Sequence, residues 1–265
     1  MRIVAHLRAL FDPATTRDQV LARARSLGEV ESIVGISGSE RMHILFLYHR
    51  VLAEELNRST LPARSRYRLL LLLESGLQDD LLADLQGQES ALASYARAVT
   101  NPLPTRGSHW ADVMRDEMAV LGALPGVSFV SLYCPDAEGV FKIEQIAGRM
   151  AALASDLLLD PAYRLMLASH GRHGQSLVAE TWRRQEIMRA ANYQSQPELL
   201  PWKAIAEQLD VDSMLGVPIV SADDRPVAVL GLYGIYATQF ESSRMQEFAL
   251  GLHHRWSELW RWRTS

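Results

Sequence analysis

The stretch GQSLVAETWRRQEIMRAANYQSQPELLPWKAIAEQLDVDSMLGVPIVSADDRPVAVLGLYGIYATQF, residues 174–240, decides the fold of this chain. Two apolar runs near its end, residues 213–220 and 227–236, are separated by residues 221–226, SADDRP, which have the composition of a turn. Before them, short amphipathic segments alternate with a loop rich in Asn, Gln, Pro and Tyr. This order predicts a hairpin of an antiparallel sheet, with short helices and loops that enclose a pocket beside it.

The residues around this stretch extend the same sheet. Residues 109–124 have the apolar spacing of a helix and end at Pro125-Gly126, a strong stop signal. Two strand-like runs follow, residues 127–134 and 140–147, with a turn between them. Residues 241–262 have the spacing of a long terminal helix. The second half of the chain is therefore predicted to be an antiparallel sheet flanked by helices.

The first half is predicted to be entirely helical. Helical patterns cover residues 16–27, 40–57 and 63–99, the last as one long helix or a broken pair. The segment Asn101-Pro-Leu-Pro-Thr-Arg-Gly-Ser108 then interrupts the pattern with two prolines and a glycine. We therefore expect an α+β protein in two domains, an all-α helical bundle at 1–103 and a mixed domain with its terminal signalling helix at 104–265.

Composition limits the possible partners. A chain of 265 residues that is 48% hydrophobic can bury two modest cores. A formal charge of -4 and scattered basic residues give no broad attraction for nucleic acid. A single cysteine excludes an intramolecular disulfide and favours the cytoplasm. The sequence also predicts no membrane span, since no apolar run approaches the roughly 18 residues that one needs.

The second half resembles a GAF domain over about residues 105–262. The motifs that carry this resemblance are Leu124-Pro-Gly-Val127, Asp136 to Gly139, Ala147-Gly148, Ala179 to Met188, Pro197 to Trp202, Ser213 to Ile219, and Leu230 to Tyr233. The version with Pro197, Pro201-Trp202 and Ser213-Met-Leu-Gly-Val-Pro218 is most similar to GAF domains of bacterial proteins that carry downstream GGDEF and EAL domains for cyclic di-GMP turnover. The order of the motifs over the whole length carries the resemblance.

The first half resembles the divergent, globin-like helical input region that precedes a GAF domain in some of those proteins. Residues 21–36, followed by a helix and residues 68–95, carry this likeness. Where relatives often have a histidine, this chain has Glu31-Ser32, so the resemblance does not extend to a haem ligand. The sequence identifies no cofactor.

The resemblance implies a cavity between one sheet face and the loops around residues 149–202. The residues expected to line it are Phe141, Trp182, Tyr193, Trp202 and Ser213, followed by Cys134 and Tyr236. Aromatic faces with phenol and indole groups suit a planar or amphipathic ligand. The alternative is that Trp182 and Trp202 close the core and the pocket is filled.

Metal and catalytic sites have little support in the sequence. His170 and His173 stand in a Gly-rich stretch as candidate metal ligands, but no carboxylate or thiolate lies nearby, and a solvated loop is the alternative. The free methionine sulfoxide reductase branch of the GAF family uses several cysteines, whereas this chain has Cys134 alone. No GGDEF or EAL signature occurs in the chain. We therefore expect a non-enzymatic chain.

The terminal helix carries an apolar stripe that predicts an interface. Phe248, Leu252, Trp256 and Trp260 lie along it, and aromatic clusters of this kind favour protein contacts. We predict a homodimer in which these helices pair, or else a helix that packs back on the helical half of the chain. The function predicted is a sensory region of a bacterial signalling protein, in which a small molecule in the GAF pocket acts through the dimer helices on a downstream cyclic di-GMP output domain. The alternative is an interaction and dimerisation scaffold with a filled pocket.

Overall fold

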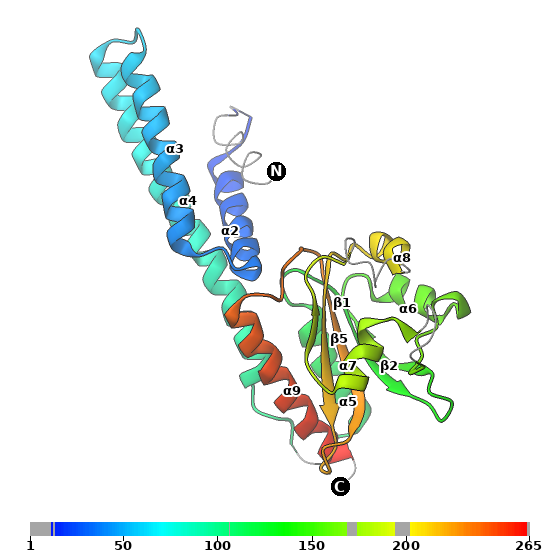
Figure 1. Ribbon diagram of the computed structural model, residues 1–265. Helices are drawn as coiled ribbons and strands as arrows, with labels where there is room; N and C mark the ends of the chain where they lie inside the picture. The colour runs from blue at the N-terminus through cyan, green and yellow to red at the C-terminus, as the bar shows by residue number, and fades with distance from the viewer. Residues whose placement is uncertain (1–11, 13, 106, 169–173, 194–201, 264–265) are drawn as a thin grey trace. The chain divides into compact units, whose positions relative to one another are not determined.

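The computed structural model describes residues 12, 14–105, 107–168, 174–193 and 202–263. The chain divides into two compact units, Met1–Ala93 and Ser94–Ser265 (Figure 1). The division lies inside helix α4 (Ala63–Thr100), earlier than the boundary predicted at residues 103–104. α4 itself ends where the predicted linker begins, at Asn101.

The first unit is helical, as predicted. It contains α2 (Arg17–Val34), α3 (Gly38–Arg58) and the first part of α4, which is one continuous helix of 38 residues. Capping boxes start α2 and α3, where Thr16 pairs with Gln19 and Ser37 pairs with Glu40. Each box satisfies backbone N–H groups that have no partner inside the helix.

Two glycines let α2 cross α4 at close range. A Cβ atom on Gly28 would overlap the backbone carbonyl of Asp84, and one on Gly87 would overlap the backbone of Arg25. Only residues without a Cβ atom allow two helix backbones to come this near. A hydrogen-bonded ion pair between Arg17 and Asp79, at 2.5 Å, adds a polar contact at the side of the crossing.

The second unit is built on a five-stranded antiparallel sheet of order β2-β1-β5-β4-β3. Its strands are β1 (Val127–Pro135), β2 (Phe141–Ala147), β3 (Met188–Ala190), β4 (Ser213–Val220) and β5 (Pro226–Gly234). The four longer strands coincide with the predicted runs to within two residues. Gly126, at φ 78°, makes the sharp turn that separates the first helix of this unit from β1.

Helices cover both faces of this sheet. α5 (Trp110–Gly122) packs against β1 and β2, and α9 (Ser243–Arg263) packs against β4. On the other face lies α7 (Leu177–Arg184), and Figure 1 shows α6 (Ala151–Leu159) and α8 (Lys203–Gln208) on the same side. Because both faces are covered, β1 and β4 read as nearly continuous apolar runs.

The aromatic stripe of α9 lies inside its own unit. Phe248, Leu252, Trp256 and Trp260 are all buried. Phe248 meets the ring of Tyr95 edge-on at 4.8 Å, and Trp260 meets Trp110 at 5.6 Å. A side chain that its own chain already covers offers no surface to a second copy, so the predicted dimer interface does not run through this stripe. The sequence could not show this, because the covering residues come from α4 and α5.

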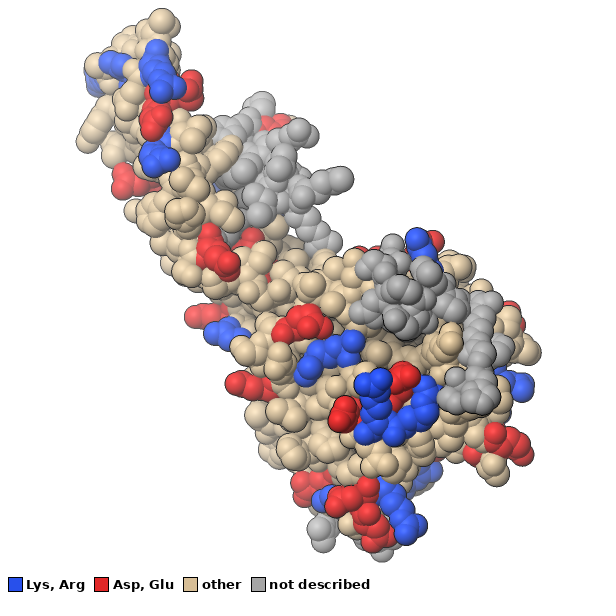
Figure 2. Space-filling model, viewed as in Figure 1, with Lys and Arg blue, Asp and Glu red and all other residues tan. Residues whose placement is uncertain are grey.

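No helix in the described part of the chain combines the length and the apolar character needed to cross a membrane. The charged side chains of the face in Figure 2 include both signs, often side by side.

Candidate functional site

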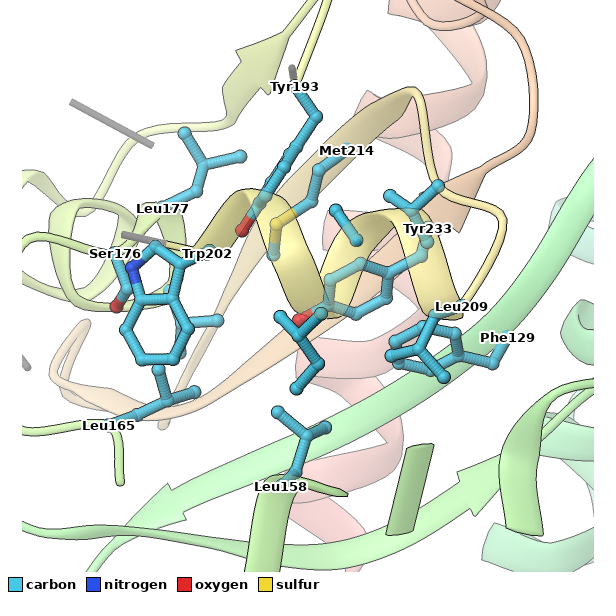
Figure 3. Close-up of a pocket in the computed structure, with 14 residues that line it drawn as sticks. Phe129, Leu158, Leu165, Ser176, Leu177, Tyr193, Trp202, Leu209, Met214 and Tyr233 are labelled. Atoms are coloured by element: carbon cyan, nitrogen blue, oxygen red, sulfur yellow. The ribbon is translucent and has the colours of Figure 1, made fainter. Parts of the chain in front are cut away.

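A small apolar cavity lies between the sheet and the helices on the α7 side (Figure 3). Its volume is about 30 Å³. β1, β4 and β5 supply Phe129, Met214 and Tyr233 to the lining, and Tyr193 and Trp202 come from the segments around α8. A space of this size holds about one or two water molecules.

The sheet side of the cavity is an aromatic platform. Phe129 and Tyr233 face each other across the β1–β5 register, and their rings stack at 4.0 Å with 11° between the planes. The hydroxyls of Tyr133 and Tyr233 form a buried hydrogen bond of 2.7 Å. Burial raises the pKa of both tyrosines above the ordinary value, so both phenols remain neutral over the physiological range.

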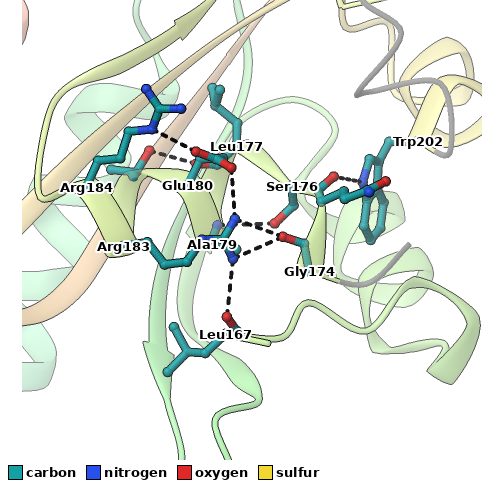
Figure 4. A network of polar contacts seen from close by, with 11 residues as sticks. Leu167, Gly174, Ser176, Leu177, Ala179, Glu180, Arg183, Arg184 and Trp202 are labelled. Carbon is teal, nitrogen blue, oxygen red and sulfur yellow. Dashed lines mark hydrogen bonds and ion pairs between the residues drawn. The ribbon is translucent and has the colours of Figure 1, made fainter. Parts of the chain in front are cut away.

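The helix side of the cavity is fixed by hydrogen bonds to the backbone (Figure 4). Trp202 Nε1–H donates to the carbonyl of Gln175 at 3.0 Å. Ser176 is the N-cap of α7, and its Oγ accepts from the N–H of Ala179 at 3.2 Å. The indole is therefore tied to the start of α7, which places its ring in the cavity wall.

Arg183 ties together the two described stretches that flank residues 169–173. Its guanidinium donates to the carbonyl of Leu167 at 3.2 Å and to that of Gly174 at 3.1 Å. Glu180 accepts from Arg183 at 3.0 Å and from Arg184 at 2.9 Å (Figure 4). These contacts hold the chain close to the cavity wall on both sides of the segment.

The structure brings two of the predicted pocket residues together, because both Tyr193 and Trp202 line the cavity. Phe141 and Trp182 lie outside this lining and pack edge-on against each other, with ring centroids 5.8 Å apart. Their contact belongs to the surrounding core.

The other three predicted residues do not line the cavity. Ser213 is buried at the start of β4, paired with Gly234, and Tyr236 follows the end of β5. Cys134 falls on the opposite face of β1 from Tyr133, because successive side chains of a strand alternate. Burial, with the nearby Glu144 carboxylate, raises the pKa of the Cys134 thiol to about 12.

Sequence analysis missed the residues that the sheet supplies to the lining, Phe129, Met214 and Tyr233, and Tyr133, which bonds to Tyr233 behind it. The period of two on β1 groups Phe129 with Tyr133 on one face. It cannot say which face of the sheet carries the cavity, since the helices on both faces bury nearly every residue of the strand.

His170 and His173 lie outside the described residues. Among the residues that are described, no group of three His, Cys, Asp or Glu side chains could hold a metal ion. The described side chains that line the cavity are likewise uncharged. The arrangement therefore suits a neutral, apolar or aromatic occupant, with tyrosine hydroxyls and Ser176 as the polar groups nearby.

Comparison with known proteins gives a family match. The chain matches the family model described as GAF domain over residues 111–252, more than half of its length. No curated protein matches it. Similar solved structures include the GAF domain from Acinetobacter phosphoenolpyruvate-protein phosphotransferase, with 18% identity, covering 65% of this chain and 91% of that one at a TM-score of 0.40.

Two further similar structures are enzymes. Free methionine-R-sulfoxide reductase from Neisseria meningitidis, in complex with its substrate, shares 17% identity over 67% of this chain and 91% of that one, at a TM-score of 0.43. The type II free methionine-R-sulfoxide reductase from Thermoplasma acidophilum shares 15% identity over 57% of this chain and 94% of that one, at a TM-score of 0.42.

Proposed function

Since the chain belongs to the GAF domain family, we propose that it is a non-enzymatic sensory region whose GAF unit binds a small neutral molecule. The observation that carries this proposal is the cavity between the sheet and α7. It is lined by aromatic and aliphatic side chains, and its described lining has no charge to pair with an anionic or cationic ligand.

Binding would require the cavity to enlarge, since about 30 Å³ admits no organic molecule. The side chain of Trp202 is the part of the lining best placed to move. One side-chain hydrogen bond to Gln175 fixes its indole. A ligand that replaces the indole against Tyr193 and Tyr233 would select an open state that is a minor population without it. A planar ring of one or two cycles has the right shape for that space.

The residues support a binding role rather than a redox role. Sulfoxide reduction through sulfenic acid and disulfide steps needs a thiolate and a second thiol. The chain has one cysteine, and burial raises the pKa of that thiol to about 12. Cys134 also lies on the other side of the sheet from the cavity, as the alternation along β1 requires.

The wider role proposed is regulation inside a bacterial, cytoplasmic signalling protein. In this proposal the chain forms a homodimer, and the state of the GAF unit passes to a downstream output domain for cyclic di-GMP turnover. The motif resemblance of Pro201-Trp202 and residues 213–218 supports this output. The first unit would be a divergent globin-like input region, and we propose no haem in it because Glu31-Ser32 stands where the histidine would be.

A second candidate function is a scaffold with a filled pocket. The observation that favours it is the small empty volume, about 30 Å³, that the side chains leave between the sheet and α7. In this case the GAF unit would act through protein contacts, and no small molecule would bind.

Native mass spectrometry of the purified chain, followed by thermal unfolding against a panel of neutral one- and two-ring aromatic compounds, separates these functions. A sensor gives a retained small molecule or a melting temperature that rises with compound concentration. The variant Trp202→Ala is expected to increase binding of indole because it opens the wall, and Trp182→Ala, outside the lining, serves as its matched control. The absence of retained mass, of a thermal shift and of indole binding by Trp202→Ala would leave the scaffold.

A further inference from the structure

The hairpin formed by α3 and the first part of α4 leaves most of its apolar residues exposed. Among the described side chains of residues 42–79, Leu45 is buried and all others are at least partly exposed. Phe46 is 64% exposed and Leu72 is 62% exposed. Grooves of about 320 and 220 Å³ run between the two helices. Because the apolar side of an amphipathic helix normally packs against a neighbouring element, the exposed apolar side chains of the hairpin indicate a bundle that lacks a layer.

A short segment of α4 carries a basic residue at one end of a leucine run and an acidic residue at the other. Five consecutive leucines, residues 69–73, are bounded by Arg68 on one side and Glu74 on the other. Arg68, Leu71 and Glu74 follow each other at intervals of three, so they lie along one side of the helix. Leu71 is 48% exposed, and both charged side chains are exposed as well. We call these three residues the α4 outer face.

The charges of α4 are also divided along its length. Arg64, Arg66 and Arg68 stand near its start, whereas residues 69–93 contain five acidic residues and no Lys or Arg. Of these acidic residues, Asp80 and Asp84 are buried and Asp79 pairs with Arg17, so Glu74 is the exposed carboxylate nearest to the leucines. This order opposes the helix dipole, which favours acidic side chains near a helix N-terminus, and the first turn of α4 has none. Such an order does not stabilise an isolated helix. A second helix that runs in the opposite direction would place opposite charges side by side.

We propose that the α4 outer face docks against the same face of a second copy of the chain, in antiparallel orientation, with the symmetry axis at Leu71. Leu71 then meets Leu71 of the second copy. Arg68 lies opposite Glu74 of the second copy, and the reverse pair forms on the other side, each about 4.5 Å along the helix from the axis.

The charge pattern selects the antiparallel orientation. Parallel pairing through the same leucines would bring Arg68 against Arg68 and Glu74 against Glu74, and like charges in contact repel. The leucines alone would allow either orientation. The occupant is a second copy because the pattern is self-complementary about its centre, as a two-fold symmetric interface requires. Figure 2 shows the same hairpin with charged side chains scattered between uncharged surface.

This inference names the surface of the homodimer proposed above and does not depend on a ligand in the GAF cavity. Sedimentation equilibrium of the full chain at several concentrations measures the dimer directly. Leu71→Glu is expected to raise the dimer dissociation constant at least tenfold. Leu159→Glu is the matched control, because Leu159 is a 72% exposed leucine on α6, and it is expected to leave that constant unchanged. Far-UV circular dichroism checks that both variants remain folded.

Charge exchange tests the orientation. Arg68→Glu and Glu74→Arg alone are each expected to raise the dissociation constant roughly tenfold, since each disturbs two pairs per dimer. The double variant Arg68→Glu with Glu74→Arg restores both pairs and is expected to recover the original constant within about threefold.

Four results would overturn the proposal. These are a monomeric wild-type chain, a Leu71→Glu variant that dimerises like the wild type, single charge variants without effect, and a double variant weaker than either single one. The third result points to parallel pairing, because residues 68 and 74 would then each meet their own copy and keep like charges in every variant. A chain that is monomeric but cosediments with phosphatidylserine vesicles through Leu71 overturns the proposal in favour of a lipid-binding face. Loss of ligand binding in the GAF cavity would leave the dimer measurements unaffected, so the two proposals fail separately.

Discussion

Glu117 on α5 and Arg255 on α9 form a two-pronged ion pair inside the second unit. Arg255 Nε donates to Glu117 Oε2 at 2.8 Å, and Nη2 donates to Oε1 at 2.5 Å. The third guanidinium nitrogen, Nη1, donates to the carbonyl of Asn101 at 2.5 Å. The side chain of Arg255 is 5% exposed and that of Glu117 is 12% exposed. One arginine thus joins α5, α9 and the residue that follows α4.

Removing one partner of this pair should destabilise the second unit strongly. Glu117→Gln leaves the guanidinium of Arg255 buried without a countercharge, and we expect a loss of about 3 kcal/mol in the free energy of unfolding. Urea denaturation followed by tryptophan fluorescence measures it. Asp112→Asn is the control, since Asp112 pairs with Arg115 at the surface of the same helix, and its loss should stay below about 1 kcal/mol. Equal losses in the two variants would contradict a dominant role for the buried pair.

The crossing of α2 and α4 predicts opposite effects for two glycine substitutions. Gly28→Ala places a methyl group against the backbone of Asp84, so we expect it to destabilise the first unit by about 1–3 kcal/mol. Gly76 lies on α4, as Asp84 does, and a Cβ atom added there has nothing within 4 Å. Gly76→Ala should therefore stabilise the first unit by about 1 kcal/mol through helix propensity. The midpoint of urea unfolding at 222 nm reports both. A neutral Gly28→Ala would mean that the two helices do not meet there.

The size of the cavity predicts which added methyl group the second unit accepts. Val211→Ile extends a lining residue into about 30 Å³ of empty space, so we expect a change within about 0.5 kcal/mol or a small gain in stability. Val217→Ile adds the same methyl group to a fully buried residue of β4 outside the lining and should cost about 1–3 kcal/mol. Thermal unfolding of both variants is the measurement. If both lose stability equally, the cavity is filled in solution.

The buried tyrosines predict a loss of stability in alkali. Burial raises the pKa of Tyr133, Tyr193 and Tyr233 in the folded chain above the ordinary tyrosine value of about 10. Above that value the unfolded chain binds fewer protons than the folded one, so the free energy of unfolding falls as pH rises further. Their contribution is fully present below pH 10. Urea midpoints from pH 8 to 11 test this trend.

Absorbance at 295 nm supplies the second half of that experiment. The buried tyrosines should ionise together with unfolding, so absorbance at 295 nm should rise over the same pH range in which the urea midpoint falls. Tyr67, at 65% exposure, supplies the exposed comparison. Tyr133→Phe should reduce the alkaline loss, whereas Tyr67→Phe should not change it. Reversible ionisation of every tyrosine near pH 10 in the folded chain would contradict the buried hydrogen bond between Tyr133 and Tyr233.

The elements of this protein could be predicted from short-range patterns. The runs at residues 213–220 and 227–236 predict β4 and β5 because strand side chains repeat every two residues, and Thr16 and Ser37 begin helices because their side chains cap nearby N–H groups. These signals act within a few residues of the chain. They are present in the sequence whatever the element packs against.

The environment of each side chain was decided by the tertiary structure. Trp256 and Trp260 are apolar on an amphipathic helix whether their partner is a second copy or the same chain, and only the docking of α9 on β4 and α5 buries them. Phe129 and Tyr233 become one side of a cavity because strands 100 residues apart pair in register. The sequence by itself determined which residues would be helix and strand and which side chains are apolar. The surfaces that meet were settled only by contacts between distant segments, because apolar burial has no direction and depends on which partner surface excludes the water.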